Sequence, residues 1–232
     1  MRFAVNSGRL EPEFNPFTHE FLEEILRAVA HAWARMKRPK SDEIEDRITF
    51  RLAGRLQNDP IFRNLPYDIV PQYWLLGIDG RRLGRLDLRF KHRNSQKDYF
   101  AFESKRLHVR YPGGSFGSEY SVYSGVAGMG AFLDGLYSGD LPAAGMLGYV
   151  MDGDTERARQ GMMRNLVNRQ TELNLQNATL ALASFSLDAQ NSLGGTLLME
   201  SKHQLSERQL RLFHMLLPCR KYSGNPIRSL EA

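Results

Sequence analysis

The sequence predicts an α/β fold in which a mixed central sheet is flanked by helices. Three observations indicate this class. Large apolar residues recur at helical spacing in two segments near the N-terminus. Segments with strand-like patterns follow, separated by polar turns. A further helical segment and a short apolar strand come next, and this alternation is typical of a sheet with helices on its faces.

Two helices are expected before the first strand. The first covers residues 17–36, with apolar residues at helical spacing: Phe21, Leu22, Ile25, Leu26, Val29 and Trp33. The second covers residues 42–57, with one apolar stripe: Ile44, Ile48, Leu52 and Leu56. The cluster Asn58-Asp59-Pro60 ends this second helix, because proline cannot continue the hydrogen-bond ladder.

Three strands are expected next, over residues 67–76, 84–90 and 99–107. The middle strand alternates strictly between apolar and polar side chains, so it has two different faces. One face carries Leu86, Leu88 and Phe90, and the other carries Arg85, Asp87 and Arg89.

The rest of the chain continues the pattern. After a loop rich in proline and glycine we expect a helix, a strand, a helix and two strands, over 120–137, 144–151, 154–173, 179–185 and 196–201. A terminal helix over 206–217 is expected to open with a Ser206-x-x-Gln209 capping box. The whole chain, residues 1–232, is expected to form one domain with a core at 41–151 and a C-terminal extension at 152–232.

Composition narrows the class of protein. The chain has 232 residues, of which 42% are hydrophobic and 25% are charged, and these proportions exclude collagen-like, coiled-coil and wholly disordered proteins. Cys219 is the only cysteine, which excludes an internal disulfide and a cysteine-based zinc site. No apolar run is long enough to span a bilayer, and residues 1–14 lack the apolar segment of a secretory signal. We therefore expect a cytoplasmic protein with no membrane partner.

Basic residues are clustered along the chain. Lysine and arginine number 31 against 26 acidic residues, a net charge of +5. Many of the basic residues lie close together: Arg35, Lys37, Arg38 and Lys40, then Arg81, Arg82, Arg85, Arg89, Lys91, Arg93 and Lys97, then Lys105, Arg106 and Arg110. Such clusters attract phosphate backbones, so a nucleic acid is the expected partner. The alternative is a solvated basic surface with no such partner.

Two predicted strands carry acids in this basic setting. Asp87 lies on the polar face of the middle strand, and Glu103 and Lys105 share one face of the next strand. A charged pair after the apolar run Phe100-Ala101-Phe102 is costly to bury without a functional reason. Carboxylate oxygens suit Mg²⁺, and a lysine beside the metal can orient an attacking water. The alternative is a surface salt bridge between strands, such as Glu103 with Arg89.

The spacing of these residues resembles that of the PD-(D/E)xK restriction-endonuclease-like nucleases. Asp87 lies on one predicted strand and, after 15 further residues, Glu103-Ser104-Lys105 lies on the next. The predicted order helix, three-stranded meander, helix, strand over about residues 41–151 has the same sequence of elements, with helical additions at both ends. The first letter of the signature is missing, because Leu86 and not proline precedes Asp87.

The resemblance implies a Mg²⁺-dependent deoxyribonuclease, a phosphodiesterase acting in phage defence, restriction or repair. Asp87, Glu103 and the backbone carbonyl of Ser104 would hold Mg²⁺, for which Mn²⁺ could substitute, and Lys105 would orient the water. The chain has no ATPase motif, so a helicase or ATPase partner, or a second copy of the chain, is expected to assist it on DNA.

The resemblance also implies an acid on the preceding helix, for which Glu43, Glu45 and Asp46 are candidates. At 100° per residue, Glu45 falls about 40° from the centre of the apolar stripe, whereas the other two fall about 140–160° away. Only Glu45 can therefore lean toward the sheet and assist catalysis. The alternative role for Glu45 is a capping-box partner of Asp42 at the helix start.

Two other functions remain open. Gly113-Gly114-Ser115-Phe116-Gly117 matches the nucleophile elbow of serine hydrolases, with Asp134, His203 and His214 as candidate partners. The charged segment that ends at Pro112 is unlike the apolar strand that feeds such an elbow, so a glycine-rich surface loop is favoured. If the chain is a nuclease, this loop is expected to cover or contact DNA. The second alternative is a non-catalytic nucleic-acid-binding subunit on the same fold.

Overall fold

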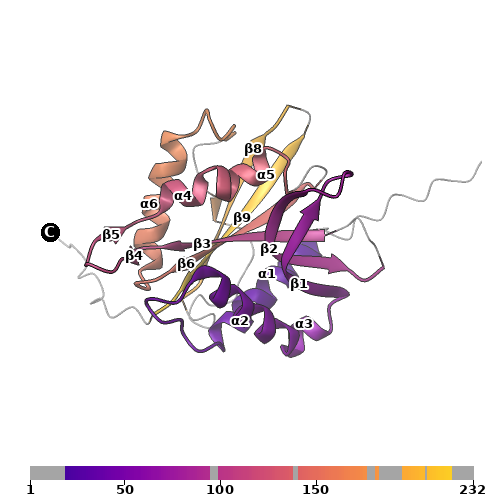
Figure 1. The fold of residues 1–232 in the computed structure, drawn as a ribbon, viewed down its shortest axis with the longest axis horizontal. Coiled ribbons are helices and arrows are strands. Elements are labelled where there is room, and N and C mark those ends of the chain that lie inside the picture. The colour runs from indigo at the N-terminus through magenta and orange to yellow at the C-terminus, as the bar shows by residue number, and fades with distance from the viewer. Residues whose placement is uncertain are drawn as a thin grey trace, which may run out of the picture.

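The computed structural model of the chain describes residues 19–94, 99–137, 141–176, 181–182, 195–206 and 208–220. Within these residues the chain forms a mixed seven-stranded sheet with helices on both faces (Figure 1). The predicted α/β class with a mixed central sheet is confirmed.

The helical segments in the described part of the chain are α1 His19–Ala34, α2 Glu45–Gln57, α3 Pro60–Arg63, α4 Tyr120–Ser124, the π-helical η1 Val126–Gly130, α5 Ala131–Leu133 and α6 Thr155–Asn168. The strands are β1 Tyr67–Leu76, β2 Arg82–His92, β3 Tyr99–Leu107, β4 Val109–Arg110, β5 Phe116–Gly117, β6 Ala143–Val150, β7 Ala181–Leu182, β8 Leu197–Gln204 and β9 Gln209–Pro218.

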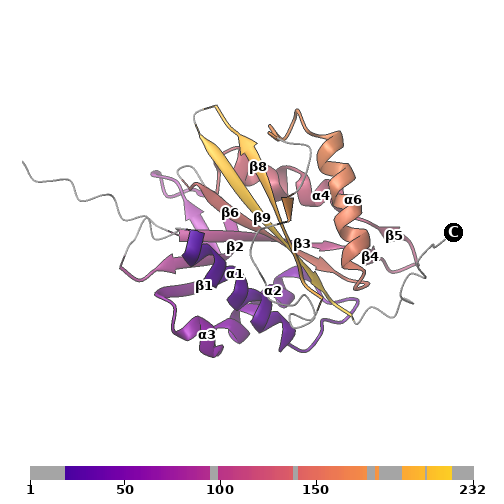
Figure 2. The ribbon, with the colours of Figure 1, turned by 180° about the vertical axis from the view of Figure 1, so that it is seen from behind.

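The strand order in the large sheet is β1-β2-β3-β6-β9-β8-β7. β1, β2 and β3 form an antiparallel meander, whereas β3, β6 and β9 run parallel in the middle of the sheet. Every residue of β6 is buried, as expected for a strand that has parallel neighbours and helices on both faces. Figure 2 shows α1 and α2 on one side of these central strands and α6 on the other.

Two apolar cores lie on the two faces of the sheet. In one core, Trp33 of α1 and Leu52 of α2 pack with Phe102 of β3. In the other, Tyr123 of α4 and Met162 of α6 pack against the opposite face. Trp33 and the ring of Tyr149 stack with centroids 5.5 Å apart, which fixes α1 on the sheet.

The N-terminal half agrees well with expectation. The helices over 17–36 and 42–57 and the three strands are confirmed as α1, α2 and β1 to β3, although residues 17 and 18 lie outside the described part. The second helix begins at Glu45 and not at Asp42, so Ile44 precedes it and is 61% exposed. The other members of the stripe, Ile48, Leu52 and Leu56, are fully buried.

The predicted terminal helix over 206–217 is wrong, because Gln209–Pro218 is strand β9 and no Ser206 capping box forms there. β9 lies between β6 and β8 and is buried on both faces. A strand of this kind has apolar residues on both faces, so its sequence lacks the alternation that distinguishes a strand from a buried helix. The C-terminal part of the chain therefore supplies strand β9 to the middle of the sheet, in addition to helix α6.

The predicted helix over 120–137 is broken into α4, η1 and α5. Gly128 has non-helical dihedral angles, and a Cβ built on it would lie 2.1 Å from the Tyr123 carbonyl oxygen. Only glycine allows this close approach, so the small residues mark an interruption. The predicted helix over 154–173 is α6, which ends at Asn168. Of the predicted strand over 179–185, the structure describes only β7.

Candidate active site

The candidate site lies at a fork in the sheet. The β2–β3 ladder runs from the pair Lys91–Tyr99 to the pair Leu88–Phe102 and ends there. Beyond this point β2 continues only beside β1, and β3 continues beside β6. The next position in the same register would pair Asp87 with Glu103, so the two predicted acids lie where the strands separate.

Asp87 is only 4% exposed, and hydrogen bonds hold both oxygens of its carboxylate. Its Oδ2 accepts hydrogen bonds from the backbone nitrogen of Ser104 at 2.8 Å and from the Ser104 hydroxyl at 2.5 Å. Its Oδ1 accepts from Nε2 of Gln72 at 3.1 Å. Gln72 has a φ of 54°, a left-handed conformation that interrupts the β1–β2 pairing opposite Asp87.

Glu103 and Lys105 form a buried ion pair on the opposite face of β3 from Ser104. Nζ of Lys105 lies 2.5 Å from Oε1 of Glu103 and donates to the Ser104 carbonyl oxygen at 2.9 Å. The alternative of a surface pair between Glu103 and Arg89 is therefore not the arrangement found: Glu103 is only 6% exposed, and the Arg89 guanidinium lies over the rings of Tyr73 and Tyr99.

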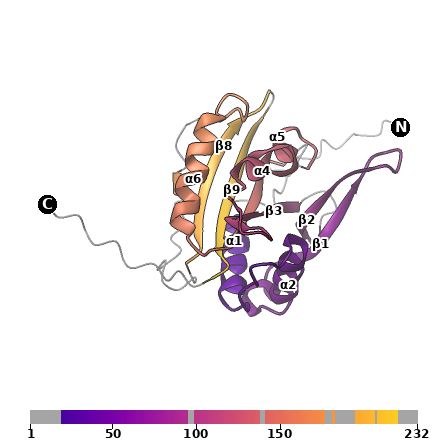
Figure 3. The same ribbon diagram turned by 60° about the vertical axis from the view of Figure 1, so that its left-hand side comes forward.

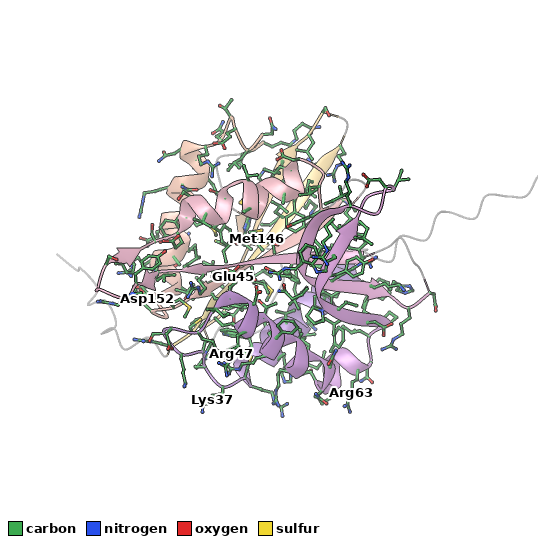
Figure 4. All side chains as sticks on the ribbon, in the orientation of Figure 1. Lys37, Glu45, Arg47, Arg63, Met146 and Asp152 are labelled. Carbon is green, nitrogen blue, oxygen red and sulfur yellow. The ribbon has the colours of Figure 1, made fainter. Side chains whose placement is uncertain are left out.

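Glu45 reaches the same place from the first turn of α2, near the middle of the molecule (Figure 4). Its Oε2 accepts from the backbone nitrogen of Arg106 at 2.9 Å, and its Oε1 lies 3.6 Å from Nζ of Lys105. Glu43 instead pairs with Arg51 at 2.7 Å, and Asp46 pairs with Arg85 at 3.1 Å.

Of the three acids considered, Glu45 is thus the one that reaches β3. Its alternative role in a capping box with Asp42 is wrong, because Ile44 occupies the N-cap position and no side chain caps α2. The helix starts too late for Asp42 to reach its first free N–H groups.

The charges at the fork are unbalanced. Burial, together with the nearby charge of Asp87, raises the pKa of Glu103 to about 8 despite the contact with Lys105. Burial also raises the pKa of Glu45. Burial alone would lower the pKa of Lys105, but the charges of Glu103 and Glu45 outweigh it and raise that pKa. Three carboxyl groups surround one ammonium group, so a further cation would be stabilised here.

The residues present fit Mg²⁺. Asp87 and Glu103 offer hard oxygen donors, and Oε2 of Glu103 is a buried acceptor without a hydrogen-bond partner among the described residues. No group of three or more His, Cys, Asp or Glu side chains in the described ranges is placed to hold a metal ion by itself. Mg²⁺ commonly takes one or two carboxylates and keeps several waters, so two acids suffice. The Ser104 carbonyl oxygen, expected as a third ligand, accepts a hydrogen bond from Lys105, and its role as a metal ligand stays a prediction.

Two supporting residues were missed from the sequence. The Thr49 hydroxyl lies 3.1 Å from Oγ of Ser104 and 2.9 Å from the hydroxyl of Tyr149, deep between α2 and the sheet. These bonds fix the Ser104 side chain, which in turn fixes Asp87. Thr49 lies one helical turn after Glu45, so it shares the face that points to β3, and this spacing was the available signal. Gln72 had no comparable signal.

The hydrolase alternative finds no support in the geometry. Ser115 lies in the turn between β4 and β5 and not between a strand and a helix, and it is exposed. Its proposed partners are elsewhere: the rings of His203 and His214 both contact the hydroxyl of buried Ser201, at 2.7 and 2.8 Å. The expectation of a glycine-rich loop at this position is confirmed.

Comparison of the chain with protein-family models, curated proteins and solved structures found no match. No helix in the described part of the chain is long and apolar enough to cross a membrane. The residues of the site are therefore the basis on which a function can be assigned.

Proposed function

We propose that this chain is a Mg²⁺-dependent nuclease that hydrolyses phosphodiester bonds in DNA, built on a restriction-endonuclease-like core. The observation that carries the proposal is the fork itself, where Asp87 faces the position of Glu103 and the Glu103–Lys105 ion pair is buried beside Glu45. A buried ion pair is weak support for stability, so a role in chemistry accounts better for its presence.

The order of elements supports the same proposal. α2 precedes the meander β1, β2 and β3, the broken helix α4 to α5 follows, and β6 returns parallel to β3. This is the helix, three-strand meander, helix and strand expected from the resemblance. Asp87 and the Glu103–Lys105 pair lie on the second and third strands of the meander, as the motif requires.

Each side chain has a distinct chemical role in this proposal. A bound Mg²⁺ would supply a Lewis acid and a water of lowered pKa. Two carboxylates would hold the ion. One is Asp87, which Ser104 and Gln72 orient, and the other is Glu103, whose Oε2 is free. Lys105 presents an ammonium group that can orient the attacking water and balance the charge that develops on the phosphate. Glu45 positions that ammonium group, since its Oε1 lies 3.6 Å from Nζ of Lys105.

The hairpin beyond the fork supports DNA as the substrate. β1 and β2 continue past Asp87 as a two-stranded ribbon that projects from the body of the molecule (Figure 3). The guanidinium groups of Arg82 and Arg85 lie over the exposed ring of Trp74, at 4.5 and 5.7 Å from its centroid. A basic two-stranded ribbon fits the major groove of a duplex and also attracts its phosphates.

The test compares wild type with Lys105→Ala and with Lys202→Ala, which removes an exposed lysine from β8. Supercoiled and linear DNA are incubated with Mg²⁺ or Mn²⁺, and binding is measured separately in Ca²⁺. Because Lys105 would stabilise the transition state more than the bound ground state, Lys105→Ala should cleave at least about 100-fold more slowly. Its DNA affinity should stay within about threefold of wild type, since many other basic residues remain. Lys202→Ala should behave as wild type.

Other outcomes would decide against this mechanism. If cleavage and affinity fall together in Lys105→Ala, the lysine is an ordinary phosphate contact. If the wild type binds DNA but never cuts it, the chain is a non-catalytic nucleic-acid-binding subunit. This outcome requires that no cleavage occurs with either metal, at dimer-forming concentrations, or with a helicase or ATPase partner added. Restriction, phage defence and repair are the processes that a confirmed activity would serve.

A further inference from the structure

A second charged hollow lies outside the fork, at the carboxyl ends of the three parallel strands. His108 follows β3, Asp152 follows β6 and Arg220 follows β9, and all three line a pocket of about 320 Å³. Arg110 of β4 and Arg157 of α6 complete its basic lining. In α/β proteins ligands bind outside the carboxyl ends of the strands, so this is a favoured position for a ligand.

The pocket carries an excess of positive charge. Three arginines, Arg110, Arg157 and Arg220, face one carboxylate, Asp152, so these four side chains carry a formal charge of +2. Asp152 already pairs with Arg157. Arg110 and Arg220 are exposed, and among the described residues their side chains have neither a hydrogen bond nor an ion pair. A phosphate monoester carries about −1.5 to −2 at pH 7 and would match this charge.

Buried His108 holds the wall of the pocket in place through contacts with Asp152 and Tyr120. His108 is 2% exposed and has a φ of 56°, and its Nδ1 lies 2.9 Å from Oδ1 of Asp152. Its Nε2 lies 2.5 Å from the hydroxyl of Tyr120. Both ring nitrogens are engaged, so His108 is a positioning residue that orients Asp152 and, through it, Arg157. The Arg157 guanidinium is thus preorganised for an anion.

An aromatic ring borders the same pocket. Phe116 of β5 is 50% exposed, and its ring is braced by the His108 ring at 5.7 Å and by the Arg157 guanidinium at 5.4 Å. An exposed ring beside arginines is typical of surfaces on which nucleic-acid bases stack. The pocket therefore offers contacts for a base and for a phosphate within one site.

We propose that this pocket binds the terminal phosphate monoester of a DNA strand, with the terminal base against Phe116. His108 lies three residues beyond Lys105 along the chain, about 10 Å at the rise of a β-strand. That span corresponds to about three stacked nucleotides. If the proposed nuclease function holds, on which this consequence rests, the enzyme cuts within a few nucleotides of a phosphorylated end.

Binding is tested on the full chain in a metal-chelating buffer, so that no cleavage occurs. Fluorescence anisotropy compares single-stranded oligonucleotides with a 5′-phosphate, with a 3′-phosphate or with hydroxyls at both ends. We expect at least a tenfold preference for one phosphorylated end. Arg110→Ala and Arg220→Ala should each reduce this preference to about twofold, while affinity for the hydroxyl-ended strand stays within about threefold, as losing one phosphate contact implies.

Arg63→Ala is the matched control. Arg63 is an exposed arginine on α3, on the opposite side of the molecule from Asp152 (Figure 4). It should retain the full preference for the phosphorylated end, and thermal unfolding should show that all three variants are folded. Equal affinity of the wild type for phosphorylated and hydroxyl ends would overturn the proposal. So would inorganic phosphate or a mononucleotide binding as tightly as the phosphorylated strand.

The two proposals can fail separately. If the end preference depends on Arg110 and Arg220 but the wild type never cleaves with Mg²⁺, the pocket stands and the nuclease function falls. If the wild type cleaves and binds without regard to end phosphorylation, the nuclease function stands and the pocket assignment is overturned.

Discussion

Ser104 shows how one small residue joins two faces of β3. Its neighbours Glu103 and Lys105 point to one side, whereas its own hydroxyl points to α2 and donates to Asp87 at 2.5 Å. The motif treats this position as variable, yet the fully buried hydroxyl also contacts Thr49. A larger side chain here would separate α2 from the sheet and release Asp87, so the position tolerates little change.

Asp87 is the residue on which metal binding is expected to depend. In Asp87→Ala the wild-type binding of Mn²⁺, measured by titration calorimetry, should disappear, because one of two carboxylate ligands is lost. Removing this buried acceptor also leaves the Gln72 side-chain amide and the Ser104 backbone nitrogen without their acceptor, so thermal unfolding must confirm that the variant is folded at the titration temperature.

Asp68→Ala is the control. It removes an exposed carboxylate of β1 that pairs with Arg93 at 3.2 Å. It should bind Mn²⁺ as the wild type does. Equal Mn²⁺ affinity in Asp87→Ala and wild type would remove Asp87 from the site.

At the scale of elements, the contact between β3 and β6 sets the position of Glu103. Gly145 of β6 pairs with Phe102, the residue before Glu103, and the Phe102 ring covers it. A Cβ on Gly145 would lie 2.2 Å from ring carbons of Phe102, which a real contact does not allow. The ring is itself packed edge-on against Phe90 and Phe100, so it has little room to move.

Gly145→Ala should therefore lower the free energy of unfolding by about 1–3 kcal/mol, the usual cost of overpacking a core, as measured by urea denaturation. Cleavage should fall as well, because β3 must shift to relieve the clash. Gly54→Ala is the control: it lies on α2 with no atom within 4 Å of its added Cβ, and it should stabilise the helix by up to about 1 kcal/mol. A Gly145→Ala protein as stable as wild type would show that the ring can move aside.

At the scale of the whole molecule, a buried polar network joins parts of the chain that are distant in sequence. His214 of β9 contacts the Tyr123 hydroxyl of α4 at 3.1 Å and the Ser201 hydroxyl of β8 at 2.8 Å. Burial, with a smaller effect from His203, lowers the pKa of His214 to about 3. Burial likewise lowers the pKa of His203. Both rings are therefore neutral in the folded protein at neutral pH.

This network predicts acid sensitivity. The unfolded chain takes up a proton on His214 near pH 6.5, whereas the folded chain does so only near pH 3. Its contribution to stability is thus complete above pH 6.5 and is lost as the pH falls toward 3, by up to about 1.4 kcal/mol per pH unit. His214→Gln, which keeps hydrogen-bonding groups but cannot titrate, should show a shallower loss in urea denaturation between pH 6.5 and 4.5. An unchanged slope would mean that other groups govern acid unfolding.

The sequence by itself determined the elements whose patterns are local. Alternation predicted β2, and helical spacing predicted α1 and most of α2, because these periodicities reflect which face of an element is buried. The same local geometry put Glu103 and Lys105 on one face and singled out Glu45 among three acids. Each of these inferences needs only neighbours within a few residues along the chain.

Only the tertiary structure decided the features that depend on distant partners. β9 is a strand because it inserts between β6 and β8, and a segment buried on both faces has no periodicity to reveal that choice. Packing likewise brings Gln72 and Ser104 to Asp87. It also forms the second pocket from residues as far apart as His108 and Arg220. Local sequence patterns specify which face of an element is apolar, whereas the fold alone selects the element that covers it.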